Sequence, residues 1–179
     1  LKEKLEATQE LVETQKQFFE KIPAYKNIKI LINQKLGKVK GERVLGQITG
    51  HTVKIAEGKV RPDTLPHEIS HYAVDVLRKF GTKKDMDLIK RGEKMFKSEE
   101  KLVQAIGEYA QGKLKNKTLI SKVKTWIKSF NARLKDMLGI ATKADVAYLL
   151  SRKVVEGNIP LNRRVKNFVN QLETHYQTD

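Results

Sequence analysis

Two histidines stand four residues apart in the stretch TLPHEISHYAVDVL, and a glutamate directly follows the first of them. Residues i and i+4 of an α-helix lie one turn apart on the same face, so His67 and His71 can present both imidazoles to one metal ion. Catalytic zinc sites use three protein ligands and keep one position for water. Glu68 is then placed to accept a proton from that water. The spacing therefore predicts a hydrolytic centre with Zn²⁺ as its cofactor.

The sequence around this motif predicts the helix that the motif needs. Thr64 suits the N-cap, Pro66 the first turn and Gly81 the end, with apolar residues at helical spacing between them. The alternative is that both histidines are ordinary surface or partly buried residues and that Glu68 interacts only with the helix dipole. The chain has four histidines, and two of them fall at this spacing on a predicted helix start. This coincidence favours the metal site.

A third ligand must come from another segment. The chain contains no cysteine, so histidine or a carboxylate has to complete the set. The stretch SEEKLVQAIGEYAQGK offers Glu99, Glu100 and Glu108. On a helical wheel Glu100 shares one flank with Val103 and Gly107, a strip that a second helix could approach closely, whereas Glu108 lies on the opposite flank. We therefore expect Glu100 as the third ligand, with Glu108 and Glu99 as the alternatives.

The elements that must position these residues begin with three short β-branched runs, NIKILINQ, RVLGQI and HTVKIA. Turn residues separate them, with Thr49 and Gly50 at the second turn, which predicts a small meander. After Arg61 helical periodicity dominates. We expect an α+β fold, mostly helical, with a small β-sheet before the motif helix. Further helices are expected at 84–96, 98–111, 118–138, 143–155 and 162–176.

The pattern divides the chain into three parts. Residues 1–22 are expected to form an amphipathic helix, residues 23–157 the domain that carries the motif, and residues 158–179 a C-terminal helix. The chain begins with Leu1 and not Met, so we expect a segment of a longer polypeptide. No apolar run reaches the roughly 18 residues that span a bilayer, and no leader pattern opens the chain, so a soluble protein is expected.

The chain is strongly basic, with 36 Lys and Arg against 21 Asp and Glu and a formal net charge of +15. Such an excess can attract nucleic acid or another polyanion. Basic residues are concentrated from Gln111 to Gly139, where either a nonspecific DNA contact or a solvated helix face is expected. Aromatic residues are few and are not interleaved with arginine, which excludes the stacking platform of a single-strand reader. Trp126 lies on the apolar side of its expected helix and is expected in the core.

Three stretches together, TLPHEISHY, EEKLVQAIGEYAQGK and VKTWIKSFNARLKDMLGI, resemble a known family. It is the zincin-type, gluzincin-like metallopeptidase domain of the large polyvalent proteins of bacteriophages, and the resemblance spans Val44 to Val155. In that family the HExxH helix is followed by a segment of the form ExLARAFEAYL and then by a basic helix with a tryptophan. Glu100 falls on the leading glutamate and Tyr109 on the tyrosine, while Val103 replaces an alanine of the pattern.

The resemblance implies a zinc peptidase with His67, His71 and Glu100 as metal ligands and Glu68 as the base. It implies that HTVKIA is the sheet edge that receives an extended substrate, with an ordinary sheet strand as the alternative. His51, next to the turn glycine, is either an oxyanion-stabilising residue or a polar turn residue.

The partners that this reading implies are a polypeptide substrate and other regions of the same longer polypeptide or virion proteins. The implied location is the virion, or the host cytoplasm after delivery. The rival function is a structural or DNA-associated virion module whose zinc site is vestigial or purely structural.

Overall fold

The computed structural model describes residues 8–115, 128, 132–133, 135–136, 139 and 141–177. Over these residues the predicted α+β class is confirmed, because helices and one mixed sheet share a hydrophobic core. The helix expected at 118–138 and the basic segment from Gln111 to Gly139 lie largely outside the described residues, and Trp126 lies wholly outside them. Within the described ranges, no helix combines the length and the apolar composition that crossing a bilayer requires.

Side-chain caps start several of the described helices. The side chains of Thr8, Thr82, Thr142 and Asn162 each accept the backbone N–H three residues ahead, which satisfies a donor that the helix leaves free. The helices are α1 (Gln9–Glu20), α2 (Thr64–Phe80), α3 (Lys83–Phe96), α4 (Glu99–Lys115), α6 (Lys143–Glu156) and α7 (Arg163–Val169), and Pro23–Tyr25 forms a short 3-10 turn.

The motif helix α2 is confirmed, with one difference at its start. Asp63 occupies the N-cap position that the sequence assigned to Thr64, and its side chain makes no capping hydrogen bond. The Asp63 carboxylate is used elsewhere, because it accepts hydrogen bonds from Arg61 and Tyr176. The first turn of α2 is therefore tied to residues outside the helix.

The strands are β1 (Lys29–Gln34), β2 (Lys38–Val39), β3 (Glu42–Thr49), β4 (Thr52–Ala56) and β5 (Glu173–Gln177). The predicted hairpin of β3 and β4 is confirmed, and Gly50 in its turn has a φ of 60° that suits glycine. β1, however, pairs in parallel with β4 and not with β3, so the predicted meander is wrong for the first strand. The central position of β4, between β1 and β3, also shows that HTVKIA is not a sheet edge.

The C-terminal segment departs from the helix predicted at 162–176. α7 ends at Val169, and β5 follows it and pairs antiparallel with β3. The helical pattern is satisfied by Val165 and Val169, which are buried, whereas ETHYQ carries a β-branched and an aromatic residue two apart, as strands do. The end of the chain therefore belongs to the same sheet as the segment before α2.

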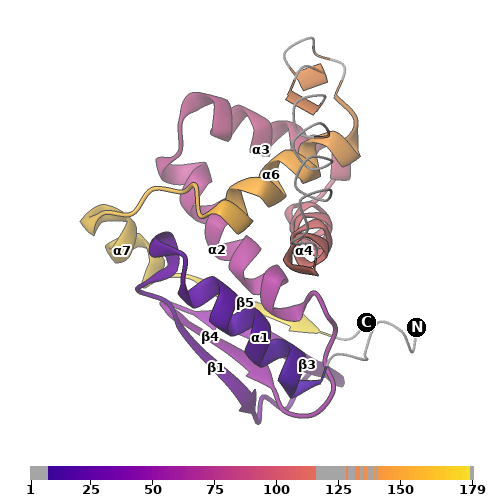
Figure 1. The fold of residues 1–179 in the computed structure, drawn as a ribbon, viewed down its shortest axis with the longest axis vertical. Coiled ribbons are helices and arrows are strands. Elements are labelled where there is room, and N and C mark those ends of the chain that lie inside the picture. The colour runs from indigo at the N-terminus through magenta and orange to yellow at the C-terminus, as the bar shows by residue number, and fades with distance from the viewer. Residues whose placement is uncertain are drawn as a thin grey trace.

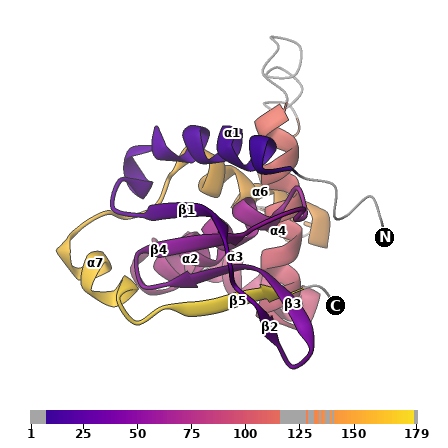
Figure 2. The same ribbon diagram turned by 90° about the horizontal axis from the view of Figure 1, so that it is seen from below.

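The sheet and the helix group lie on opposite sides of α2. Figure 1 shows the strands together with α1 in one half of the molecule and α3, α4 and α6 in the other, with α2 between them. In Figure 2, seen from below, the strands lie in front of α2. Helix α2 is consequently buried on nearly every side. Helix α1 joins the same core through Val12 and Phe19, both fully buried.

Candidate metal centre

His67 and His71 lie in the first two turns of α2. Their side chains are 0% and 6% exposed. The two ring centroids are 4.8 Å apart, and the ring planes are inclined by 72°. The spacing of four residues thus brings both imidazoles to one face of the helix, as predicted.

Helix α4 brings Glu100 to these histidines because it approaches α2 very closely. A Cβ atom at Gly107 would lie 3.1 Å from the Cα and 3.2 Å from the backbone nitrogen of His67, so the approach depends on glycine. The predicted contact of a second helix at Gly107 is therefore confirmed. Glu100 lies two turns earlier on this flank, with Oε1 at 3.0 Å from His67 Nε2 and Oε2 at 2.9 Å from His71 Nε2.

These three residues, the His–His–Glu cluster, have the composition and size of a metal site. Their ligand atoms all lie within 4.8 Å of one another. Ligands around tetrahedral zinc are roughly 3.3 Å apart, close to the two histidine–glutamate distances. Each buried Nε2 atom lies close to one oxygen of Glu100, but neither makes a well-aligned hydrogen bond to it or to another described residue, and a shared ion would satisfy both. Glu100 is 54% exposed, so the cluster is open to solvent on its side.

The charges of the cluster follow from burial and from its own contacts. Burial lowers the pKa of His67, which favours the neutral form that binds metals. Burial also acts to lower the pKa of His71, but the carboxylates of Glu100 and Glu68 outweigh it and raise that pKa. Partial burial acts to raise the pKa of Glu100, and the two imidazoles hold it well below its usual range. Glu100 is therefore an anion, and a metal bound by the cluster would displace the proton that His71 attracts.

Glu68 is fully buried in the same helical turn, where β3 leaves room for it. A Cβ atom at Gly46 would lie 3.2 Å from Glu68 Cγ. The Thr174 hydroxyl donates a hydrogen bond of 3.1 Å to Glu68 Oε2, while Oε1 is buried without a partner among the described residues. Burial raises the pKa of Glu68 to about 8. A carboxyl group with one unpartnered oxygen and a pKa near neutral pH is suited to acid–base chemistry.

Two residues of β5 that the sequence reasoning missed contact the site. Thr174 bonds Glu68, and Tyr176 stacks on His67 with ring centroids 3.7 Å apart and planes inclined by 5°. The Tyr176 hydroxyl donates to Asp63 Oδ2 at 3.1 Å. The alternation in ETHYQ is a signal for a strand, but nothing local in the sequence shows which strand it joins.

The other candidates from the sequence lie outside the cluster. Glu99 Oε1 is 3.4 Å from Arg78 Nη2, and Glu108 Oε1 is 3.8 Å from Arg61 Nη2. The Nε2 atom of His51 is 2.9 Å from a backbone carbonyl oxygen of α7. The two glutamates are therefore paired with arginine, and His51 has the contact of a polar turn residue.

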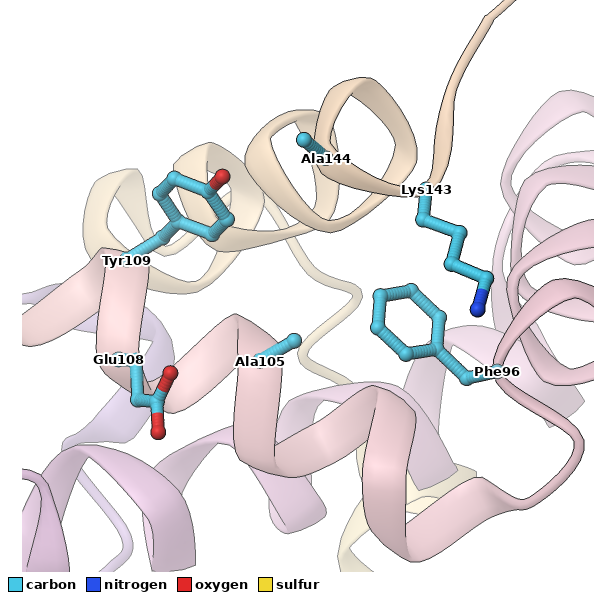
Figure 3. Close-up of a pocket in the computed structure, with 6 residues that line it drawn as sticks. All are labelled: Phe96, Ala105, Glu108, Tyr109, Lys143 and Ala144. Atoms are coloured by element: carbon cyan, nitrogen blue, oxygen red, sulfur yellow. The ribbon is translucent and has the colours of Figure 1, made fainter.

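A pocket of about 430 Å³ lies between α4 and the start of α6. Figure 3 shows Glu108 and Tyr109 of α4 turned to different sides, with Lys143 above Phe96 at the other end. The lining residues are Phe96, Ala105, Glu108, Tyr109, Lys143 and Ala144. None of them belongs to the His–His–Glu cluster, so the pocket is not lined by that cluster.

The described structure thus gathers His67, His71 and Glu100, sets Glu68 beside them, and leaves Glu99, Glu108 and His51 elsewhere. The resemblance to zincin-type metallopeptidases stays a prediction. Comparisons of the chain with models of protein families, with curated proteins and with solved structures found no match.

Proposed function

We propose that this chain is a zinc-dependent peptidase domain in which His67, His71 and Glu100 hold the metal and Glu68 is the base. The observation that carries the proposal is the convergence of two buried imidazoles on both oxygens of one carboxylate, at 3.0 and 2.9 Å. Two neutral imidazoles and one carboxylate are a ligand set of catalytic zinc in hydrolases. The exposed side of Glu100 leaves room for a water molecule and a substrate.

The reaction follows from the two different carboxylates. When bound, Zn²⁺ would lower the pKa of a water molecule and polarise the carbonyl group of a peptide. Glu68 accepts the proton of the attacking water as the new C–O bond forms, and it delivers that proton to the amide nitrogen as the C–N bond breaks. In the metal-free protein burial raises the pKa of Glu68 to about 8, which favours the second step because the carboxyl group holds its proton until the amine leaves. A bound Zn²⁺ would favour the carboxylate form that the first step needs.

An unpaired strand edge beside the site, in the described part of the chain, favours a peptide as the substrate. β4 cannot accept an added strand, since β1 and β3 occupy both its edges. β5 pairs with β3, and in the described part of the chain no strand pairs with its other edge. Because β5 contacts both Glu68 and His67, a peptide added to that edge would run past the site. We therefore assign the substrate edge to β5.

The wider setting comes from the resemblance described above. It supports a domain of a longer phage-encoded polypeptide that is carried in the virion and delivered to the host cytoplasm, with virion proteins or other regions of the same polypeptide as substrates. The formal net charge of +15 suits a location beside DNA.

Metal analysis together with a cleavage assay tests the proposal. We expect about one zinc per chain and its loss in His67→Ala. Glu68→Gln should keep the zinc and cut casein or a peptide library about 10²- to 10⁴-fold more slowly, because proton transfer is removed. Glu108→Gln, outside the cluster, is the matched control and should retain both zinc and cleavage. The proposed peptidase would be refuted if Glu68→Gln cleaved at the wild-type rate, or if the wild type bound no zinc when zinc was supplied.

The rival structural site makes a different prediction. Structural zinc has four protein ligands, whereas the cluster has three within the described residues. Full zinc occupancy with a wild type that cuts none of these substrates, and an unfolding temperature that falls sharply on chelation, would favour the structural role.

A further inference from the structure

The register of β5 directs two of its side chains toward α2. Thr174 pairs with Ile48 of β3, and Tyr176 pairs with Gly46. Directly paired residues of antiparallel strands point to the same face, and Gly46 faces α2, since an added Cβ there would meet side chains of α2. Glu173, one position before Thr174, points to the opposite face of the sheet.

Thr174 makes the two oxygens of Glu68 different from each other. Its hydroxyl fixes Oε2 at 3.1 Å, and the connection joins residues 106 positions apart in the sequence. Oε1 remains buried and unpartnered among the described residues. A buried oxygen without a partner costs free energy unless a water or a substrate group supplies the missing hydrogen bond. The fixed oxygen thus leaves the other one for the reacting water.

Tyr176 holds the ring of His67 in a similar way. The two rings are parallel and in contact, and the Tyr176 hydroxyl is anchored on Asp63 at 3.1 Å. Asp63 is in turn held by Arg61 Nε at 3.1 Å, and the Arg61 guanidinium lies 5.1 Å from the centre of the Tyr176 ring. The exposed fractions of Asp63 and Arg61 are 5% and 7%, so this support is shielded from water. The stacked Tyr176 ring therefore restricts rotation of the His67 imidazole and fixes the direction in which Nε2 points.

We propose that β5 is a positioning strand of the site: Thr174 orients Glu68 so that Oε1 faces the reacting water, and Tyr176 orients His67 so that Nε2 faces the metal. The role of Thr174 rests on the proposed peptidase activity, whereas the role of Tyr176 rests only on metal binding by the cluster. A strand that only extended the sheet would need its backbone pairing with β3. It would need neither a hydroxyl on the base nor an aromatic ring on a ligand.

The Tyr176 contact is tested by metal binding to the full chain. Competition with a chromophoric chelator gives the zinc affinity, and the visible absorption of the Co²⁺-loaded protein reports the ligand geometry. Tyr176→Leu should weaken zinc about 10- to 100-fold and shift the Co²⁺ spectrum, the range found when a supporting residue behind a metal ligand is lost. Tyr176→Phe keeps the ring and should show a smaller effect. Glu173→Gln, on the same strand but the other face, should match the wild type.

The Thr174 contact is tested by steady-state kinetics. Thr174→Val has nearly the same shape but no hydroxyl, so zinc affinity and KM should stay within about twofold while kcat falls about 10-fold or more. Thr174→Ser restores the hydroxyl and should recover most of kcat. Denaturant unfolding of each variant identifies a loss of activity that merely follows loss of fold.

The outcomes separate this inference from the proposed peptidase. Wild-type kcat in Thr174→Val, or an unchanged zinc affinity and Co²⁺ spectrum in Tyr176→Leu, overturns the positioning strand even if the wild type is an active peptidase. If the wild type binds zinc and cuts nothing, the peptidase and the role of Thr174 fall together. Weaker zinc binding and a shifted Co²⁺ spectrum in Tyr176→Leu would then still show that Tyr176 of β5 positions His67.

Discussion

The two halves of the site are built differently. The half that we propose to hold the metal, called the metal-holding half, consists of His67, His71 and Glu100. It comes from two helices that touch at Gly107, and it is open at Glu100, whose side chain is 54% exposed. The half that we propose to transfer protons is Glu68, which is 0% exposed and is held by a strand residue 106 positions later in the sequence. One half therefore depends on helix packing, and the other depends on completion of the sheet.

The difference appears in the charges of the two carboxylates. Glu100 is stabilised as an anion, because two imidazoles hold its pKa well below its usual range despite partial burial. Glu68 has no such pair of contacts, and burial raises its pKa to about 8. When the environment pushes two neighbouring carboxyl groups in opposite directions, they take different roles. Glu100 has the properties of a ligand, and Glu68 has those of a proton carrier.

The largest expected effect comes from removing the exposed carboxylate. Glu100→Ala should weaken zinc binding by more than about 100-fold, beyond the effect of losing a supporting residue, because it deletes one of three ligands. Glu99→Ala and Glu108→Ala, whose carboxylates pair with arginine, should stay within a few-fold of the wild type. Isothermal titration or chelator competition measures all three. Equal losses in the three variants would contradict the assignment of Glu100.

A smaller effect is expected on the free energy of unfolding of the metal-free protein, which should change with pH because of the buried Glu68. Between the unfolded pKa of about 4.3 and the folded pKa of about 8, folded Glu68 keeps a proton that the unfolded chain has released. Its contribution to stability is full below this window and is lost as pH rises through it, by at most about 1.4 kcal/mol per pH unit. His71 has the same sign because its pKa is raised, and His67 has the opposite sign.

Urea unfolding in EDTA between pH 5 and 8 measures this slope. Glu68→Gln cannot titrate, so its free energy of unfolding should depend less on pH than that of the wild type. Glu108→Gln replaces a carboxylate outside the cluster and should keep the wild-type slope. Identical slopes in wild type and Glu68→Gln would show that Glu68 is not buried as a protonated acid.

The smallest effect is expected at the contact between the two helices. Gly107→Ala gains about 1 kcal/mol of helix propensity but places a methyl group against the backbone of His67, which costs about 1–3 kcal/mol. We expect a net loss of up to about 2 kcal/mol and weaker zinc binding. At Gly112 of the same helix no atom of a described residue lies within 4 Å of an added Cβ, so Gly112→Ala should stabilise by about 0.5–1 kcal/mol and leave zinc binding unchanged. Thermal unfolding with and without zinc compares the pair, and zinc binding that is equally strong in both variants would contradict the close contact.

The metal-holding half could be predicted because its signals are local. The helical period of α2 places His67 and His71 on one face, and the wheel of α4 places Glu100 beside Gly107. Both patterns are confirmed by the contacts between the helices. The hairpin of β3 and β4 was predicted for the same reason, since its turn residues lie between its strands.

The other half could not be predicted, because strand pairing across long sequence distances leaves no local pattern. The runs that form β1 and β4 show their β propensity but not their parallel pairing. Two other strands, β2 and β3, lie between them in the sequence. Val165 and Val169 fit a helix that could have continued, and the residues after them were assigned to it. The contacts of Thr174 and Tyr176 follow from that missed strand.

The distance in sequence between Glu68 and Thr174 has a consequence during synthesis. At roughly 5–20 residues per second, a ribosome needs on the order of 5–20 s to extend the chain by the 106 residues that separate them. The His–His–Glu cluster, proposed to bind the metal, is therefore synthesised before the Thr174 hydroxyl that contacts Glu68. If the proposed function is right, the side chains that bind the metal would be in place before the base is oriented.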